Sequence, residues 1–301
     1  MSAAAEPKLR RSMLMTPGNR PDRLLKAFVY PADCLVFDLE DSVPPDAKRE
    51  ARACVARALE APGFDGRERC VRINALASGF GADDLASLPL DRVDSVMVPK
   101  VESAAEVIEL ERLLDALDGG RGRTSPLEVV LTLETPRGVL QALAIALASA
   151  RATAIFLGSG DYSAATGAAV TANALLFARS TVAAAAGAAG AQAIDAAYFQ
   201  DVRDAEATRH DALAARELGF AGKVVFHPAQ VAVANEVFSP TPAEVERAQR
   251  LVSVYEEALA RGHGTAFANG VFVAIDLVVP ARRLLRRAEM IRSRDAGEPV
   301  T

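Results

Sequence analysis

Residues 34–41 read Cys-Leu-Val-Phe-Asp-Leu-Glu-Asp, a short apolar run that ends in acidic residues. Further short apolar runs also end at polar or glycine-rich residues, and helix-like segments separate most of them. The eight runs are Met13–Met15, Cys34–Phe37, Cys70–Ile73, Ser95–Val98, Val129–Leu133, Ala154–Leu157, Ala191–Ile194 and Val224–Phe226. This alternation predicts an α/β fold with a parallel sheet, and eight repeats predict closure into a (β/α)8 TIM barrel. The carboxyl ends of the strands would then form the active-site face.

Composition and charge favour a soluble enzyme. A chain of 301 residues is long enough for one barrel of about 250 residues and an appendage. The net charge of −5 and the absence of tryptophan argue against nucleic-acid binding. No stretch reaches the roughly 18 apolar residues of a membrane span, and residues 1–11 lack the apolar core of a signal peptide. We therefore expect neither membrane insertion nor secretion.

The three cysteines support the same location. Cys34, Cys54 and Cys70 have no metal-ligand spacing, and they lie in predicted strands or a predicted helix. This pattern is typical of reduced core residues in a cytoplasmic protein.

A proline-rich segment divides the chain. The residues Ser239-Pro240-Thr241-Pro242 indicate a boundary between a barrel of residues 1–238 and a C-terminal helical extension of residues 239–301. Thr241 is a candidate N-cap with Glu244 at the third helical position, and this pattern predicts a long helix ending near Gly262. The cluster Arg282, Arg283, Arg286 and Arg287 is interpreted as a solvated or subunit-facing helix surface.

Glu134 and Asp161 are the first candidate site residues. Each follows an apolar run, and the two runs are consecutive, so barrel geometry would bring both carboxylates to neighbouring places at the mouth. Two oxygen donors of this kind suit Mg²⁺, which fills its remaining positions with water and substrate oxygens. The alternative is that each residue only caps the helix that follows it.

Several basic and glycine residues could bind an anionic substrate. Gly158 and Gly160 allow backbone N–H groups to converge on a carboxylate or carbonyl oxygen, although a simple tight turn explains them equally well. Arg72 ends an apolar run and needs an anionic partner, which is either a substrate carboxylate or a salt bridge to Glu40 or Asp41. Lys100 has the same two interpretations.

The acidic run places three carboxylates at the mouth, those of Asp38, Glu40 and Asp41, which would repel one another unless Arg72, Lys100 or another cation lay close. The preferred role for Glu40 and Asp41 is to hydrogen-bond the water molecules on the metal ion. His227 is interpreted as a structural group in preference to a general base, while His210 and His263 are expected at the surface. No serine or cysteine stands in a G-x-S-x-G turn, which disfavours a covalent hydrolase.

Six sequence motifs resemble the family of citrate lyase beta subunits and malyl-CoA lyases. The resemblance covers about residues 10–287. The motifs lie at residues 11–19, 37–52, 71–74, 98–102, 133–138 and 222–230.

The resemblance implies a (β/α)8 barrel, Mg²⁺ dependence, a homotrimer or hexamer, and cleavage or formation of a C–C bond in a 3-hydroxyacyl thioester. It assigns the metal ligands to Glu134 and Asp161 and the substrate-binding arginine to Arg72. It also implies that the extension acts as a lid whose aspartate is the catalytic acid/base in a neighbouring subunit's barrel. Asp276 is the residue at that position, although Pro280 follows it by four residues where the family motif has two.

The expected function is therefore a Mg²⁺-dependent lyase that interconverts a malyl-, citramalyl- or citryl-type CoA thioester with an acyl-CoA and a 2-oxo acid. Arg20, Arg23 and Lys26 are candidate contacts for the phosphates of CoA. Three alternatives stay open: a CoA-independent Mg²⁺ aldolase acting on free hydroxy-diacids, a citrate lyase subunit that needs an acyl-carrier partner, and a non-catalytic binding protein.

Overall fold

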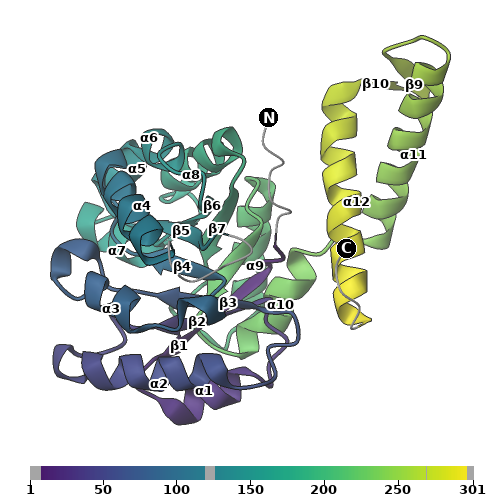
Figure 1. Ribbon diagram of the computed structural model, residues 1–301. Coiled ribbons are helices and arrows are strands. Elements are labelled where there is room, and N and C mark those ends of the chain that lie inside the picture. Colours follow the sequence, from purple (N-terminus) through teal and green to yellow (C-terminus); the bar gives the residue numbers. More distant parts are fainter. Residues whose placement is uncertain (1–7, 119–125, 269, 297–301) are drawn as a thin grey trace. The chain divides into compact units, whose positions relative to one another are not determined.

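Eight parallel strands close into a barrel in which each strand pairs with its neighbours in sequence and β8 pairs with β1 (Figure 1). The computed structural model describes residues 8–118, 126–268 and 270–296. The strands are β1 (Ser12–Pro17), β2 (Cys34–Asp38), β3 (Glu68–Arg72), β4 (Ser95–Val98), β5 (Glu128–Leu133), β6 (Ala152–Leu157), β7 (Gln192–Ala196) and β8 (Gly222–Val225). This topology confirms the predicted (β/α)8 barrel.

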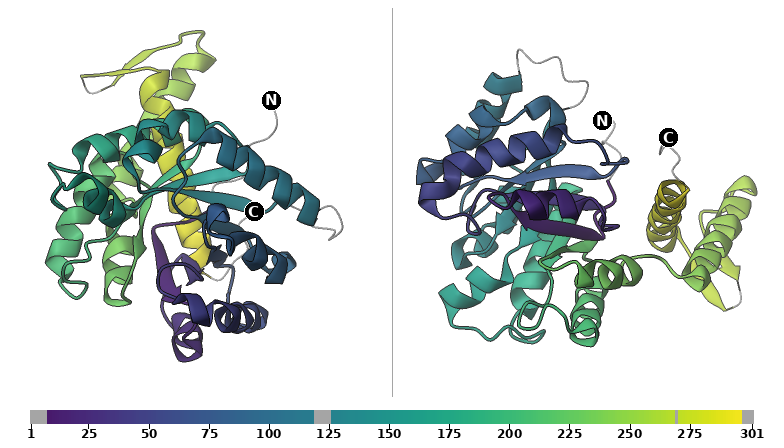
Figure 2. Two further views of the ribbon diagram at one scale, coloured as in Figure 1. Left: turned by 90° about the vertical axis from the view of Figure 1, so that its left-hand side faces the viewer. Right: turned by 90° about the horizontal axis from the view of Figure 1, so that it is seen from below.

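Helices surround the barrel and connect its strands (Figure 2). The helices of this part are α1 (Pro21–Ala27), α2 (Lys48–Glu60), α3 (Gly81–Ser87), α4 (Ala104–Asp118), α5 (Pro136–Leu140), α6 (Ala142–Ala146), α7 (Ser159–Thr166), α8 (Leu176–Ala189), α9 (Ala205–Glu217) and α10 (Ala229–Val237). The three cysteines are buried and unpaired, two in strands and one in α2, as predicted for reduced core residues.

Alternation along the strands decides which side chains point into the barrel. In β2, Cys34 and Val36 belong to the apolar cluster inside the barrel, whereas Leu35 and Phe37 pack between the strands and the helices. The next residue, Asp38, therefore points inward at the carboxyl end of the strand. The same parity turns Arg72 of β3 and Glu134, which follows β5, toward the mouth.

The position of Asp195 differs from the one predicted. The apolar run Ala191–Ile194 predicted that Asp195 follows a strand. β7 continues through Ala196, so Asp195 lies within the strand, with the inward-facing Ile194 and Ala196 on either side. Asp195 instead accepts hydrogen bonds from Arg179 of α8 and from Lys223 of β8. Arg179 and Lys223 therefore neutralise the charge of Asp195 away from the barrel mouth.

The chain divides into two compact units, Met1–Phe238 and Ser239–Thr301. The second unit contains α11 (Pro242–Ala260), the antiparallel strands β9 (Ala266–Ala268) and β10 (Val271–Val273), and α12 (Ile275–Asp295). Thr241 and Glu244 form the predicted capping box at the start of α11. Tyr255, Val273 and Val278 form a small core within this unit. Among the described residues, no helix combines the length and apolar character needed to cross a membrane.

Candidate active site

Glu134 directly follows β5, and its side chain is buried. Its Oε1 atom accepts a hydrogen bond from the backbone N–H of Lys100, 2.9 Å away. The helix that follows is capped by Thr135, whose side chain accepts a hydrogen bond from the N–H of Gly138. Glu134 therefore does not cap this helix, which was the alternative interpretation of its position.

The carboxyl group of Glu134 retains its proton to an unusually high pH. Burial raises the pKa of Glu134 first, and the negative charges of Asp161 and Glu40 raise it further. Arg72 lowers it only in part, and the resulting pKa is about 8. A shift of this size in a concave site marks a carboxylate that lacks a cationic partner.

Asp161 lies in the first turn of α7, whose N-cap residue is Gly158, so Asp161 does not cap this helix either. A Cβ atom on Gly158 would lie 2.5 Å from both Cβ and Oε2 of Glu134, so only glycine fits at this position. A Cβ atom on Gly160 would meet only the ring of Phe199, at an ordinary 3.5 Å. Close approach of the turn to Glu134 therefore depends on the first glycine and not on the second.

Arg72 is engaged by two carboxylates. Its Nε and Nη2 atoms donate to Oδ1 and Oδ2 of Asp38 at 2.6 and 2.7 Å. Its Nη1 atom lies 3.0 Å from Oε2 of Glu40. The salt bridge to Glu40 that the sequence left open is thus present, together with a bidentate pair to Asp38 that the sequence analysis did not identify.

Lys100 links the acidic loop to Glu134. Its ammonium group lies 2.6 Å from Oε1 of Glu40 and 3.2 Å from Oδ1 of Asp41. Burial lowers the pKa of Lys100, but these two carboxylates more than offset the effect and hold it above its usual range. The backbone of Lys100 adopts a left-handed conformation with φ of 56°, and its N–H group donates to Glu134.

The donor set fits a hard divalent cation. Five carboxylates lie around the mouth, those of Asp38, Glu40, Asp41, Glu134 and Asp161. Among the described residues, Arg72 and Lys100 form ion pairs with the first three. A third cation, Lys48, donates to the backbone carbonyl groups of Leu39 and Glu40, so the carboxylates still outnumber the cations. Oε2 of Glu40 is buried and accepts no hydrogen bond from the described residues. A Mg²⁺ ion between Glu134 and Asp161 would supply positive charge, and its water molecules would supply hydrogen-bond donors.

Within the described part of the chain, no three or more His, Cys, Asp or Glu side chains are arranged to hold a metal by themselves. Two protein carboxylates with water and substrate oxygens would suit Mg²⁺, which commonly keeps several non-protein ligands.

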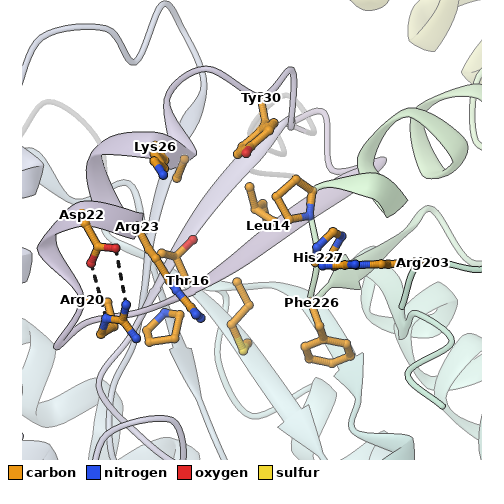
Figure 3. A pocket seen from close by; sticks show the side chains of 14 residues that line it. Leu14, Thr16, Arg20, Asp22, Arg23, Lys26, Tyr30, Arg203, Phe226 and His227 are labelled. Carbon is orange, nitrogen blue, oxygen red and sulfur yellow. Dashed lines mark hydrogen bonds and ion pairs between the residues drawn. The ribbon is translucent and has the colours of Figure 1, made fainter. Parts of the chain in front are cut away.

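A separate cavity of about 500 Å³ lies beside the first strand (Figure 3). Its walls come from β1, α1 and the segments after β7 and β8, and Arg20, Arg23, Lys26 and Arg203 contribute positive charge. Asp22 is the acidic residue in the lining, and its carboxylate contacts Arg20 at 3.4 Å. The surplus of positive charge suits a phosphate-bearing ligand.

His227 also lines this cavity, where its Nδ1 atom accepts a hydrogen bond from the backbone N–H of Ala229. This contact agrees with the structural role preferred from the sequence. His210 and His263 are exposed, as predicted. Asp276 lies in the first turn of α12, in the second unit. Its predicted role in catalysis stays a prediction.

Sequence reasoning placed Asp38 at the mouth but missed its pairing with Arg72. Roles were predicted for Glu40 and Asp41 in the same acidic run but not for Asp38. The signal was available in the alternation of the strand, because Asp38 is two residues beyond the inward-facing Val36.

Comparisons with known proteins agree with this architecture. Residues 11–228 match the family model described as HpcH/HpaI aldolase/citrate lyase. The chain is 37% identical over 285 residues to the citrate lyase subunit beta of Haemophilus influenzae, covering 94% of this chain and 98% of that protein. It is 34% identical over 303 residues to an L-malyl-CoA/beta-methylmalyl-CoA lyase of Cereibacter sphaeroides, covering 93% and 95%.

A solved structure of the protein CitE from Mycobacterium tuberculosis, in complex with magnesium, acetoacetate and coenzyme A, is also similar. It aligns with a TM-score of 0.73 and 30% identity over 95% of this chain and 100% of that one. These matches confirm the resemblance found in the sequence. The chain belongs to the HpcH/HpaI aldolase/citrate lyase family and is a carbon–carbon lyase.

Proposed function

We propose that this chain is a Mg²⁺-dependent lyase that cleaves or forms a 3-hydroxyacyl-CoA thioester of the malyl-, citramalyl- or citryl-CoA type. The products of cleavage are an acyl-CoA and a 2-oxo acid. The observation that carries the proposal is the buried Glu134, whose pKa of about 8 reflects burial and the nearby charge of Asp161. Two such carboxylates are better explained as ligands of a divalent cation than as helix caps, which was the alternative considered for each residue.

Glu134 and Asp161 would hold Mg²⁺. When bound, the ion would act as a Lewis acid on the hydroxyl and carboxylate oxygens of the substrate. Lys100 would orient Glu134 through its backbone N–H, and Gly158 would leave the space that Glu134 occupies. Glu40 and Asp41 would accept hydrogen bonds from water molecules around the ion.

Arg72 would bind the carboxylate of the 2-oxo acid through the part of its guanidinium that faces the mouth. The N–H group of Gly158 donates to the carbonyl oxygen of Leu133, so Gly158 would shape this turn, while the N–H group of Gly160 would contribute to the same subsite. Together they would hold the oxo acid in one orientation relative to the breaking bond, which is how positioning lowers a barrier.

Asp276 would take the hydroxyl proton as the C–C bond breaks, and the departing acyl thioester would leave as an enolate that is then protonated. We infer that Asp276 is supplied by a neighbouring subunit of a homotrimer or hexamer, with residues 239–301 acting as a lid. Replacing Asp276 with asparagine tests this assignment, because full activity would place the acid/base elsewhere. Sedimentation of the purified chain tests the assembly.

The positively charged cavity beside β1 favours a CoA thioester over a free hydroxy-diacid. Arg20, Arg23 and Lys26 line it, and phosphate groups are the ligands such a cluster prefers. A free diacid offers no phosphate for this surface. The buried, unpaired cysteines favour a cytoplasmic location, where thiols stay reduced.

The direct experiment is a mass-spectrometric assay of the purified chain with Mg²⁺ and malyl-, citramalyl- or citryl-CoA. Formation of an acyl-CoA and the matching 2-oxo acid is the expected result. Turnover of free diacids but of no thioester would support the CoA-independent aldolase instead. Binding without any turnover would indicate a non-catalytic protein on this scaffold.

A second candidate function is supported by the identity to citrate lyase beta subunits. Such a chain would act on a thioester carried by a partner protein. Activity of the isolated chain on a CoA thioester argues against this candidate, whereas activity only after addition of an acyl-carrier partner supports it.

A further inference from the structure

We propose that Asp38 is a positioning residue that directs Arg72 toward the carboxylate of the 2-oxo acid, an inference that rests on the function proposed above. Asp38 is the last residue of β2 and is fully buried. Arg72, the last residue of β3, is its direct partner in the strand register. The bidentate pair between them fixes the plane of the guanidinium group.

The carboxylate of Asp38 is itself held in place. Its Oδ1 atom accepts a hydrogen bond from the backbone N–H of Glu40 at 2.8 Å. Its Oδ2 atom accepts from the N–H and the hydroxyl group of Ser42 at 3.2 and 2.5 Å. Asp38 therefore cannot rotate without losing contacts to both the loop and Arg72, and it couples the orientation of Arg72 to the loop that carries Glu40.

The orientation of Arg72 leaves Nη1 for a ligand. Nη1 lies 3.0 Å from Oε2 of Glu40, yet that oxygen accepts no hydrogen bond from the described residues. The N–H bonds of Nη1 are thus not aimed at Glu40, although the two charges attract. Asp38 occupies Nε and Nη2, so Nη1 is the nitrogen that remains for the substrate.

This arrangement gives Asp38 a specific task. Without it, the guanidinium could turn and hydrogen-bond Glu40, because a charged hydrogen bond is stronger than an ion pair with poor alignment. The nitrogen needed by the oxo acid would then be occupied. Asp38 prevents this by binding the opposite edge of the guanidinium.

The test is calorimetric titration of oxaloacetate into Mg²⁺-saturated protein. In Asp38→Asn, the amide no longer matches the donors of Arg72, and oxaloacetate binding is expected to weaken roughly 10- to 100-fold. Mg²⁺ affinity should stay within about twofold, because Asp38 contacts neither Glu134 nor Asp161 in the described hydrogen bonds. Ser42→Ala is the matched control: Ser42 contacts Asp38 but not Arg72, so oxaloacetate binding should change by less than about threefold.

A double-mutant cycle separates positioning from general support of the fold. Arg72→Lys keeps a cation for Asp38 but lacks Nη1, and it should bind oxaloacetate weakly. Adding Asp38→Asn to this variant should cause no further loss. An equal loss in both backgrounds would overturn the inference, because Asp38 would then act independently of Arg72.

Three other outcomes would contradict the inference or the function on which it rests. If Asp38→Asn fails to fold, Arg72→Lys still tests the geometry, and oxaloacetate binding as tight as in the wild type would contradict it. If the wild type binds oxaloacetate and Asp38→Asn binds it with the same affinity, the role of Asp38 is contradicted but the proposed function is not. A wild-type protein that binds neither Mg²⁺ nor oxaloacetate contradicts the proposed function itself, and this inference with it.

Discussion

Two clusters of buried charge lie at opposite ends of the barrel strands, and they differ in how completely their charges pair. At the amino-terminal ends, Arg10 forms a bidentate pair with Glu68 and also contacts Glu128, which pairs in turn with Lys8. Burial alone would raise the pKa of Glu68, but Arg10 more than offsets it and holds that pKa below its ordinary value. At the mouth, the pKa of Glu134 is instead raised to about 8.

The difference shows how structural and functional charge can be told apart. The amino-terminal cluster is neutralised by the chain's own residues, so it needs no ligand. Within the described ranges, the five carboxylates of the cluster at the mouth outnumber its three cations, Arg72, Lys100 and Lys48, and a buried oxygen of Glu40 has no hydrogen-bond donor. Of these two clusters, only the one at the mouth has excess negative charge that a bound cation would neutralise.

The largest expected effect concerns the paired cluster. Glu68→Gln would leave Arg10 with a mismatched partner in a fully buried position, and breaking such a pair costs about 3–5 kcal/mol of unfolding free energy. Urea unfolding followed by circular dichroism measures it. The control is Glu109→Gln on the exposed face of α4, which should change the stability by less than about 0.5 kcal/mol. If Glu68→Gln lowers the unfolding free energy as little as the control does, the amino-terminal cluster does not have the structural role given to it.

The next effect concerns the cluster at the mouth. Glu134→Gln should reduce Mg²⁺-dependent turnover by more than about 100-fold, because the metal loses one of its two proposed protein ligands. Its unfolding free energy at pH 7 should not fall, since Glu134 is already largely protonated below its pKa of about 8. Thioester assays and urea unfolding of the same preparation test both statements. A destabilised but active variant would reverse the proposed roles of the two clusters.

The sequence predicted the barrel because its signal is repetitive: eight apolar runs separated by helical segments have few other solutions. Glu134 and Arg72 were found because each stands as a polar residue at the end of such a run. The same rule gave a misleading position for Asp195, because β7 extends one residue beyond it. A polar residue inside a strand is indistinguishable in sequence from one just after it.

The sequence offered Glu40 and Asp41 as partners of Arg72 and Lys100, and the structure contains such ion pairs, but the sequence did not predict the bidentate pair with Asp38 or the contact of Lys100 with Glu134. Which carboxylate takes Arg72 depends on the register between β2 and β3, and the contact of Lys100 with Glu134 depends on a left-handed backbone conformation at a lysine. Neither the strand register nor this backbone conformation can be predicted from composition or residue spacing. The need for glycine at position 158 became clear only when the side chain of Glu134 was seen to fill the space beside it.

A smaller effect follows from pH. Between about pH 4.5, the ordinary pKa of glutamate, and about pH 8, the unfolded chain ionises Glu134 while the metal-free folded protein keeps its proton. The contribution of Glu134 to stability therefore falls as pH rises through this window. Binding of Mg²⁺ must release that proton, so the affinity should drop about tenfold per pH unit below pH 8.

Calorimetry at pH 6, 7 and 8, in buffers that differ in ionisation enthalpy, measures both the affinity and the proton release. Glu134→Gln has no proton to release and should remove the pH dependence. If the Mg²⁺ affinity of the wild type is constant across this range, Mg²⁺ binding does not release a proton from Glu134.

The two glycines beside the carboxylates give the smallest effects and the closest comparison within the site. Gly158→Ala places a methyl group 2.5 Å from Cβ and Oε2 of Glu134, so the side chain must move, and Mg²⁺ affinity should weaken roughly tenfold. Gly160→Ala meets only Phe199 at 3.5 Å and should leave the affinity within about twofold of the wild type. Both variants place alanine in the same turn, so a difference between them isolates the contact with Glu134. Equal losses would instead indicate that the flexibility or the N–H geometry of the whole turn determines metal binding.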